Sequence, residues 1–374
     1  MKILILNWRD IKHHHQGGAE VVTFEHAKAW VKAGHRVTWF GSKSRGRPVQ
    51  ETVAGIKIIR RGNELLTVHL AAFFWYLQNG QGRFDLVIDQ FHGLPFLTPL
   101  YVKVPKLAFI HEVTRDVWLL NPLPKPLNWL VGSLGYLLEP VCFLFYRQVP
   151  FLTVSDSTRR DLVRYGIPRR NITVIHNGIK VIKPWPFPVK ASQPTVIFLG
   201  ALAKDKGIEE AIKAFGLLAK QVGNCRFWVV GGSAPGYLKK LKNMAKKAGV
   251  ARQIKFYGFV DNRTKFNLLA KAHLMVNPSY REGWGLVVIE ANSMGTPVVG
   301  YNSPGLCDSI VHHQTGLLCR RNSPQALAAN LAEALTDQKL YRRLQSGALA
   351  WSRQFSWSLA GKKSLQLVNK VNQK

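Results

Sequence analysis

Short runs of apolar residues alternate with helix-length segments along most of the chain. Strands are predicted at residues 2–6, 35–40, 56–60, 84–89, 106–110, 151–154, 195–200, 226–232, 253–258, 273–279 and 296–300. Helices are predicted near residues 18–33, 66–78, 206–220, 236–248 and 261–271, and after residues 155 and 285. Such alternation is typical of βαβ units, in which helices cover both faces of a parallel sheet. The pattern therefore predicts an α/β fold.

A proline-rich segment divides this pattern into two parts. Residues 183–194 read KPWPFPVKASQP, and four prolines in twelve residues are incompatible with regular structure. We predict two doubly wound, Rossmann-like domains, 1–182 and 195–354, joined by this linker. Residues 355–374 are predicted to form a C-terminal helix that crosses back to the first domain. Since ligands bind beyond the carboxyl ends of parallel strands, the predicted site is a central cleft that the two sheets face.

One segment, 125–147, is unusually apolar and interrupts the alternation (KPLNWLVGSLGYLLEPVCFLFYR). The first interpretation is a buried helix that breaks near Glu139 and Pro140. The second is a partly exposed patch that dips into a membrane, with Lys125 and Arg147 at its ends. The sequence does not separate them. No stretch of about 18 uncharged apolar residues occurs, so no membrane-spanning helix is predicted.

A second apolar helix, within GLVVIEA (285–291), contains a single glutamate, Glu290. Its residues 286–289 leave no polar face, so we expect the helix to be buried all round. An unpaired carboxylate there would cost several kcal/mol, so Glu290 needs a partner, which need not be protein. A ribose that donates two hydroxyl groups is one candidate. An ion pair within the protein is the alternative.

The loop before this helix carries Glu282, Gly283, Trp284 and Gly285. The backbone N–H groups of Trp284 to Leu286 are expected to meet a diphosphate at the helix N-terminus. Glu282 would then reach a sugar beyond the phosphates. Together these residues predict a nucleotide-sugar site.

Two further glycine-containing turns follow predicted strands. Gly17 and Gly18 open the first helix, where backbone N–H groups could meet an anion. Lys204 and Lys206 stand at the start of the helix after 195–200, where a lysine neutralises phosphate or is merely solvated.

Histidines supply two further candidates. His111 follows strand 106–110 at the predicted cleft, where it either contacts substrate or is structural. The triple histidine at 13–15 resembles a metal site, but adjacent loop residues are expected to point in different directions. The chain contains no Asp-x-Asp, the usual cradle for a diphosphate-bound divalent metal. No metal is therefore predicted.

The 374-residue chain is strongly basic, with 52 Lys and Arg against 21 Asp and Glu. The net charge of +31 is spread over both halves, which indicates an anionic partner or a general solubility effect. The four cysteines show no CxxC spacing, and the apolar start is too short for a signal peptide. We therefore expect a cytoplasmic protein, with the inner face of the cell membrane as an alternative place.

The stretch PSYREGWGLVVIEANSMGTPVVG (278–300) closely resembles the EGFGLxxxEAxAxGxPVV signature of glycosyltransferase family 4, retaining enzymes of the GT-B fold. The resemblance extends over almost the whole chain. Further pieces follow in the expected order: GGAE (17–20), LTVSDSTRRDL (152–162), VIHNGI (174–179), the Lys206-Gly207 pair, FYGFV (256–260) and FSW (355–357). The first motif is specific because of its length.

The resemblance implies a role for each matched position. Glu282 would contact the transferred sugar and Glu290 the ribose, while Lys206 would hold the donor diphosphate. Residues near Val260 would line the base, and His111 would contact the donor sugar. Gly17 and Gly18 would form the loop beside the pyrophosphate and acceptor.

Two departures from the family pattern stand out. Ala201 occupies the place of the arginine in GRLxxxKG, and Lys180 the place of the acid in NGVD. The first leaves one phosphate-binding cation fewer than the family pattern has, and both departures bear on donor affinity.

We therefore expect a retaining, metal-independent transfer of sugar from a nucleotide-diphosphate sugar to a glycan or lipid-linked acceptor, as in cell-envelope polysaccharide synthesis. A nucleotide-sugar epimerase or phosphorylase of the same fold is the alternative. A non-enzymatic binder of anionic polymer is a more distant one, although nucleic acid is not an expected partner. An anionic membrane surface is a further expected partner.

Overall fold

The computed structural model describes residues 1–64, 67–121, 123–181 and 188–373. Contacts divide the chain into two units, Met1–Gly178 with Ser356–Lys374, and Ile179–Phe355. The predicted linker at 183–194 lies in part outside the described residues.

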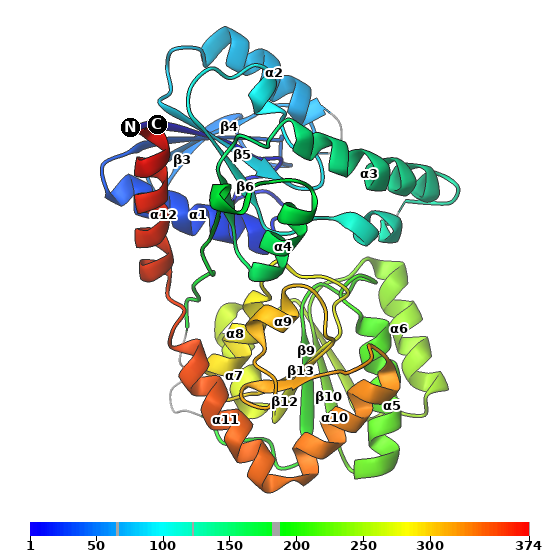
Figure 1. The fold of residues 1–374 in the computed structure, drawn as a ribbon. Helices are drawn as coiled ribbons and strands as arrows, with labels where there is room; N and C mark the ends of the chain where they lie inside the picture. Colours follow the sequence, from blue (N-terminus) through cyan, green and yellow to red (C-terminus); the bar gives the residue numbers. More distant parts are fainter. Residues whose placement is uncertain (65–66, 122, 182–187, 374) are drawn as a thin grey trace. The chain divides into compact units, whose positions relative to one another are not determined.

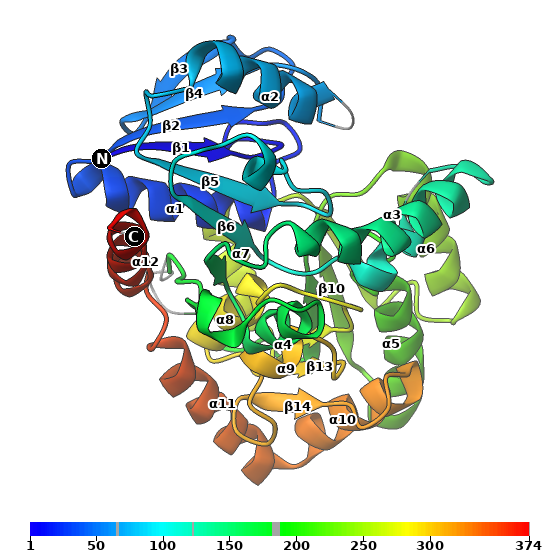
Figure 2. The same ribbon diagram turned by 45° about the horizontal axis from the view of Figure 1, so that its top comes forward.

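The first unit is built on an eight-stranded sheet of order β3-β4-β2-β1-β5-β6-β7-β8, of which Figure 2 labels β1 to β6. All neighbouring strands are parallel except β3, which pairs antiparallel with β4. Its elements are β1 (Lys2–Leu6), α1 (Gly18–Lys32), β2 (Arg36–Gly41), β3 (Gln50–Val53), β4 (Ile56–Arg60), α2 (Thr67–Asn79), β5 (Leu86–Phe91), η1 (Thr98–Leu100), β6 (Lys106–Ile110), η2 (Arg115–Leu120), α3 (Leu127–Leu144), β7 (Phe151–Thr153), α4 (Asp156–Arg164), η3 (Arg169–Asn171), β8 (Ile172–Val174) and α12 (Trp357–Asn372).

The C-terminal helix α12 belongs to the first unit, where it packs against α1 (Figure 1). Buried side chains make this contact: His26 Nδ1 and Trp30 Nε1 lie 2.9 and 3.1 Å from the Ser364 hydroxyl. The last residues of the chain thereby cover one face of the first sheet.

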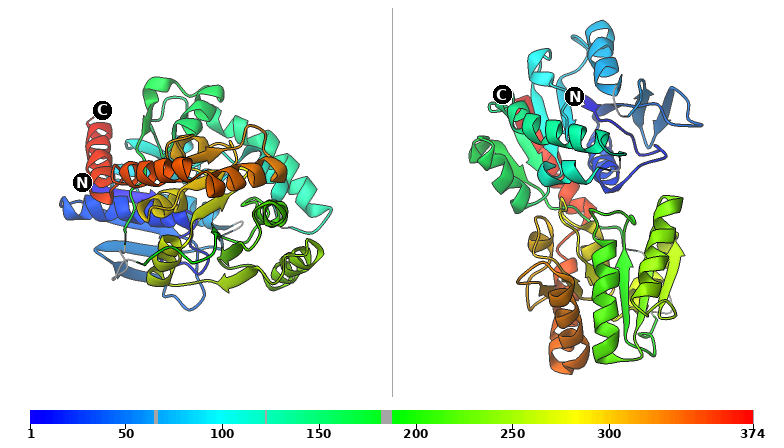
Figure 3. Two further views of the ribbon diagram at one scale, coloured as in Figure 1. Left: turned by 90° about the horizontal axis from the view of Figure 1, so that it is seen from below. Right: turned by 90° about the vertical axis from the view of Figure 1, so that its right-hand side faces the viewer.

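The second unit is built on a six-stranded parallel sheet of order β11-β10-β9-β12-β13-β14. Its elements are β9 (Thr195–Leu199), α5 (Ile208–Val222), β10 (Arg226–Val230), α6 (Pro235–Lys247), β11 (Ile254–Gly258), α7 (Asn262–Lys271), β12 (Leu274–Asn277), α8 (Leu286–Ser293), β13 (Val298–Gly300), α9 (Leu306–Ser309), β14 (Gly316–Leu318), α10 (Pro324–Thr336) and α11 (Gln338–Ser352). Helices stand on both sides of these strands, as the right-hand view of Figure 3 shows. Val196 and Phe198 of β9 face the α5 and α10 side, and Ile197 the α7 and α8 side, so strand alternation fills both layers.

The apolar segment predicted to break near Glu139 and Pro140 forms one continuous helix, α3. Pro140 removes only one backbone N–H, the partner of the Tyr136 carbonyl, and Tyr136 lies on the exposed side of the helix. The predicted break is therefore wrong. By length and composition alone α3 could cross a membrane, so the prediction of no membrane-spanning helix stays a prediction.

Candidate functional site

The two central strands of the second sheet, β9 and β12, leave a natural ligand position between their carboxyl ends. From β9 the chain winds outward to β10 and β11, whereas β12 begins the winding to β13 and β14 in the opposite direction. This change of direction is a topological switch point, where doubly wound sheets bind their ligands. The loops after β9 and β12 carry Lys206 and Glu282.

Lys206 and Glu282 meet at this point. Lys206 Nζ lies 3.0 Å from Glu282 Oε1, and the Ser279 hydroxyl lies 2.8 Å from the same oxygen. Gly207 makes the approach possible, because its φ is +71° and a Cβ there would lie 2.1 Å from the Pro278 carbonyl oxygen. A glycine is therefore required to seat the lysine loop against the loop after β12. The structure brings together two residues that stand 76 positions apart.

Two helices begin beside this pair. Gly207 is the N-cap of α5 and Gly285 that of α8, both in the left-handed conformation with φ of +71° and +81°. Unpaired backbone N–H groups and the positive end of the helix dipole make each N-terminus suitable for an anion. Gly283, Trp284 and Leu286 complete the turn, and the Trp284 ring packs against Phe355 in the core, so Trp284 contributes its backbone.

Helix α8 is not buried all round, contrary to the sequence expectation. Val288 and Ile289 are fully buried, whereas Leu286, Val287 and Glu290 lie half-buried on one shared face. This spacing is that of one side of a helix, so the absence of polar residues in the sequence did not mean the absence of an outer face. Glu290 is therefore at a boundary and not in the core.

The partner of Glu290 is Lys265 on α7, whose Nζ lies 2.6 Å from the Glu290 carboxylate. The alternative of an ion pair is the one observed in this structure. Burial nonetheless raises the pKa of Glu290, and Lys265 opposes that shift. Val260 precedes α7 and packs partly against the same layer of the core. A carboxylate held this way keeps a second oxygen for another hydrogen-bond donor.

In the first unit, Gly17 is the N-cap of α1, and its N–H donates to Glu20 Oε2 at 2.6 Å. This capping interaction occupies one of the donors that the sequence assigned to an anion. Glu20 is buried, which raises the pKa of its carboxyl group, and Trp8 Nε1 donates to its other oxygen at 3.2 Å. Gly18 follows as the first residue of the helix and is exposed.

His111 stands beyond the end of β6 in a buried, neutral network. Gln90 Oε1 accepts from Asn7 Nδ2 and from the Thr23 hydroxyl, so the Gln90 amide donates to His111 Nε2 at 2.9 Å. The proton of His111 therefore sits on Nδ1. Burial holds the pKa of His111 well below its usual range, and His92 adds to the effect. This histidine is built to donate a hydrogen bond from Nδ1, because its Nε2 is already occupied.

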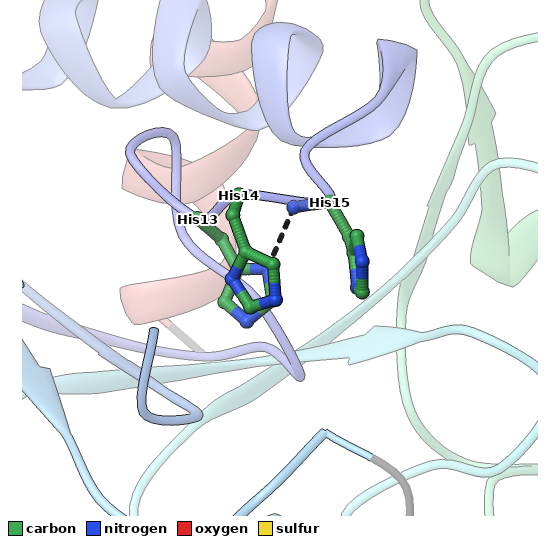
Figure 4. Close-up of side chains that lie close together, drawn as sticks. All are labelled: His13, His14 and His15. Carbon is green, nitrogen blue, oxygen red and sulfur yellow. Dashed lines mark hydrogen bonds between the residues drawn. The ribbon is translucent and has the colours of Figure 1, made fainter. Parts of the chain in front are cut away.

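The three adjacent histidines do not point apart as predicted. The rings of His13, His14 and His15 gather, with neighbouring ring centroids 4.3 and 4.1 Å apart (Figure 4). A tight turn brings them together, in which the His15 backbone N–H donates to His13 Nδ1 at 3.1 Å. His15 Nδ1 in turn lies 2.8 Å from Glu64. Both Nδ1 atoms are thus engaged within the protein, and the prediction of no metal stays a prediction.

The two departures from the family pattern lie at the surface. Ala201, Lys204 and Lys180 are all exposed. Lys204 follows β9 near Lys206, and its side chain is exposed to solvent. Among the contacts of the described residues, no carboxylate holds it in position as Glu282 holds Lys206.

Lys265, Gln90 and Ser279 were missed from the sequence. Lys265 reaches Glu290 across 25 residues, and Gln90 reaches His111 across 21. The one usable signal was that Gln90 follows a predicted strand and Ser279 ends one, whereas Lys265 lies within a predicted helix and carried no such signal. Nothing in the local sequence specified the pairing.

Two family descriptions match the chain. The description "Glycosyltransferase Family 4" matches residues 16–182, and "Glycosyl transferases group 1" matches residues 182–351. A glycogen synthase from Mycobacterium tuberculosis is 28% identical over 274 residues, which cover 71% of this chain and 63% of that protein. The chain thus spans less than two thirds of the length of this relative.

Solved structures share the fold over nearly the whole chain. A sucrose-phosphate synthase from Thermosynechococcus elongatus is 19% identical, covers 99% of this chain and 98% of its own, and has a TM-score of 0.80. Anabaena HepE, solved in complex with UDP and glucose, is also 19% identical, covers 99% and 100%, and has a TM-score of 0.75. At this identity the likeness establishes the two-domain GT-B architecture.

Proposed function

We propose that this chain, a member of the group 1, family 4 glycosyltransferases, transfers a sugar from a nucleotide-diphosphate sugar to an acceptor hydroxyl group. Its GT-B fold supports the proposal. The observation that carries the proposal is the Lys206–Glu282 pair at the switch point between β9 and β12. A cation, a carboxylate and two helix N-termini converge there. This combination suits a diphosphate that leaves from a sugar.

In the proposed mechanism Lys206 gives up its contact with Glu282 and binds the donor diphosphate instead. Lys206 and the N-termini of α5 and α8 stabilise the negative charge that develops on the leaving group. The fold already orients the N–H groups of the two helices, so they need not rearrange during the reaction. Glu282, released from the lysine, accepts hydrogen bonds from the sugar hydroxyls. Glu290 accepts the ribose hydroxyls beside Lys265.

Metal independence follows from the same arrangement in this proposal. The positive charge that a diphosphate requires comes from Lys206 and the helix ends, and the sequence has no Asp-x-Asp. Retention of configuration is proposed with front-face displacement, as the family resemblance implies. His111, neutral and protonated on Nδ1, would contribute a hydrogen bond to the donor sugar.

The acceptor is proposed to be a glycan or a lipid-linked sugar held by the first unit. The relatives support the class of substrate: one is named a glycogen synthase, and HepE was solved with UDP and glucose. A nucleotide-diphosphate hexose is therefore the proposed donor class, in a cytoplasmic enzyme. An epimerase or phosphorylase and a binder of anionic polymer are less favoured, because the family descriptions name glycosyl transfer.

The test is thermal unfolding of the full chain with UDP, GDP, ADP, CDP and dTDP, each with and without EDTA. A ligand at 100 times its Kd adds about 2.7 kcal/mol, a shift of several degrees. We expect one nucleotide to raise the unfolding temperature regardless of EDTA, and Lys206→Ala to lose that shift. No shift with any nucleotide would contradict the donor site.

A transfer assay then separates the reaction classes. With the matching sugar nucleotide, we expect free nucleotide diphosphate and a glycosylated acceptor with the anomeric configuration of the donor. Conversion of the sugar nucleotide without any release would instead identify an epimerase. Inversion at the anomeric carbon would overturn the retaining mechanism.

A further inference from the structure

Helix α3 has its polar and apolar sides reversed relative to an ordinary surface helix. Its buried positions are Gly132, Gly135, Glu139 and Phe143, at the spacing of one helix face. Its exposed side chains are almost wholly apolar: Leu127, Trp129, Leu130, Leu134, Tyr136, Leu137, Leu138, Val141 and Leu144. Trp129 is 73% exposed and Leu137 67%. The one charged residue in the helix is thus inside, and the leucines are outside.

The buried side of α3 is firmly attached to the first unit. The Glu139 carboxylate accepts from the backbone N–H groups of Thr114 and Arg115, each at 2.7 Å, and from Trp118 Nε1 at 3.3 Å. Gly132 and Gly135 let the Trp118 segment approach closely, since a Cβ at either would lie within 3 Å of it. Figure 1 shows η2, which carries Trp118, beside α3. Only 22% of the helix residues are buried, all on this side.

This attachment decides between two relations to a bilayer. The length and composition of α3 alone would allow it to span one. Spanning would expose the buried Glu139 carboxylate to hydrocarbon and leave its three donors without a partner. A helix that keeps these bonds can only lie with its apolar side in the interfacial plane.

Basic side chains border the exposed apolar surface. An open hollow of about 330 Å³ is lined by Pro140, Val141 and Leu144 of α3 together with Arg147, Arg164, Tyr165 and Gly166. Arg147 and Arg164 are both exposed, and Arg164 Nη1 lies 3.5 Å from Asp161 Oδ1. The η3 segment, which carries the exposed Arg169 and Arg170, lies next to Arg147, since Asn171 Nδ2 donates to the Arg147 carbonyl at 3.0 Å. Guanidinium groups next to aliphatic side chains match a phosphate next to acyl chains.

We propose that α3 docks the first unit on an anionic phospholipid bilayer. The apolar side of α3 enters the boundary between headgroups and acyl chains, and the arginines of the hollow contact lipid phosphates. A second copy of the chain is the less suitable occupant, because each copy carries a net charge of +31 and the same arginines. The proposal does not rest on glycosyl transfer, and it holds for the chain whatever its substrate.

The test is co-sedimentation of the full chain with phosphatidylcholine vesicles, with and without phosphatidylglycerol. We expect strong binding to the anionic vesicles and weak binding to the neutral ones. Leu137→Glu should weaken binding at least about tenfold, since it replaces buried apolar surface with a charge. The matched control is Leu359→Glu, the same change at a 44% exposed leucine on α12, and it should bind like the unchanged chain.

The arginines are tested separately. Arg147→Gln with Arg164→Gln should reduce binding to anionic vesicles about fivefold per charge removed and leave binding to neutral vesicles unchanged. Leu137→Glu should keep its unfolding temperature and its nucleotide-induced shift, which separates this test from that of the proposed function.

Three outcomes would overturn the proposal. The unchanged chain could fail to sediment with anionic vesicles. Leu137→Glu could bind as well as Leu359→Glu, which would place the contact elsewhere. A vesicle-free dimer that Leu137→Glu converts to a monomer would identify a second copy as the occupant of this surface.

Discussion

Helices α3 and α8 share one sequence pattern, an apolar helix that contains a single glutamate, and they use it in opposite ways. In α3 the carboxylate of Glu139 faces inward and is satisfied by backbone and indole donors. In α8 the carboxylate of Glu290 lies at the half-buried face and is held by the Lys265 side chain. The first is fixed by groups that cannot move independently, whereas the second is paired with a flexible side chain.

The difference indicates which glutamate is structural and which is available to a ligand. The backbone N–H groups that bond Glu139 are fixed in place beside α3, so they cannot move to follow another acceptor. Glu290 bonds Lys265 through Oε1 and keeps its other carboxylate oxygen for ribose hydroxyl groups. Burial raises the pKa of both glutamates, so the pKa alone does not distinguish them.

The largest expected effect is on stability, in Glu139→Ala. The change removes the carboxylate acceptor of the Thr114 and Arg115 backbone N–H groups, which should lower the free energy of unfolding by about 3 kcal/mol. Urea unfolding of the full chain measures the loss. The matched change Glu290→Ala should cost less, about 1–2 kcal/mol, because it removes one side-chain partner and leaves Lys265 at a position that is 18% exposed. Equal losses in the two variants would remove the distinction between the helices.

The next effect is on donor binding, in Glu290→Ala. Loss of the hydrogen bonds to the ribose should weaken binding of the matching nucleotide by about 1–3 kcal/mol. Isothermal titration gives the affinity, and Glu290→Gln, which keeps one acceptor, should fall in between. Unchanged affinity in Glu290→Ala would defeat the ribose assignment.

A smaller effect, and a gain, is expected from Ala201→Arg. The exposed position after β9 takes the arginine that the family pattern carries, and a charge-assisted bond to phosphate should strengthen nucleotide-diphosphate binding about tenfold. Ala201→Gln is the control of similar length without charge and should bind like the unchanged chain. A weaker affinity in Ala201→Arg would show that this position faces away from the diphosphate.

The smallest effect is a change in pH dependence, in Lys265→Met. Ribose binding needs the ionised form of Glu290, whose pKa burial raises and Lys265 lowers. Without the lysine the pKa rises further, so nucleotide affinity should begin to fall at a higher pH as the solution is acidified. Nucleotide titrations from neutral to acidic pH measure the midpoint. A midpoint that stays in place or moves to lower pH would show that Glu290 does not titrate in the site.

Most of the fold could be predicted because strands and helices repeat at their own periods. The strands β1, β4, β6 and β9 match the predicted ranges within a residue or so. The short strands β3, β8 and β14 and the helices α10 and α11 were not predicted, since three to four residues give too little periodicity and the surface helices carry weak signals. The C-terminal helix was predicted to cross back, and in the structure it belongs to the first unit.

Local sequence determined where the chain turns and where helices begin. Gly207 and Gly285 mark two helix starts in the left-handed region, and the order of strands places Lys206 and Glu282 in loops at the carboxyl ends of their sheet. Tertiary structure alone decided which side of each helix faces inward. The outward leucines of α3, the inward Glu139 and the Lys265 partner of Glu290 all depend on neighbours 21 to 25 residues away. A periodic pattern reports that a face exists, but the packing of distant segments decides what covers that face.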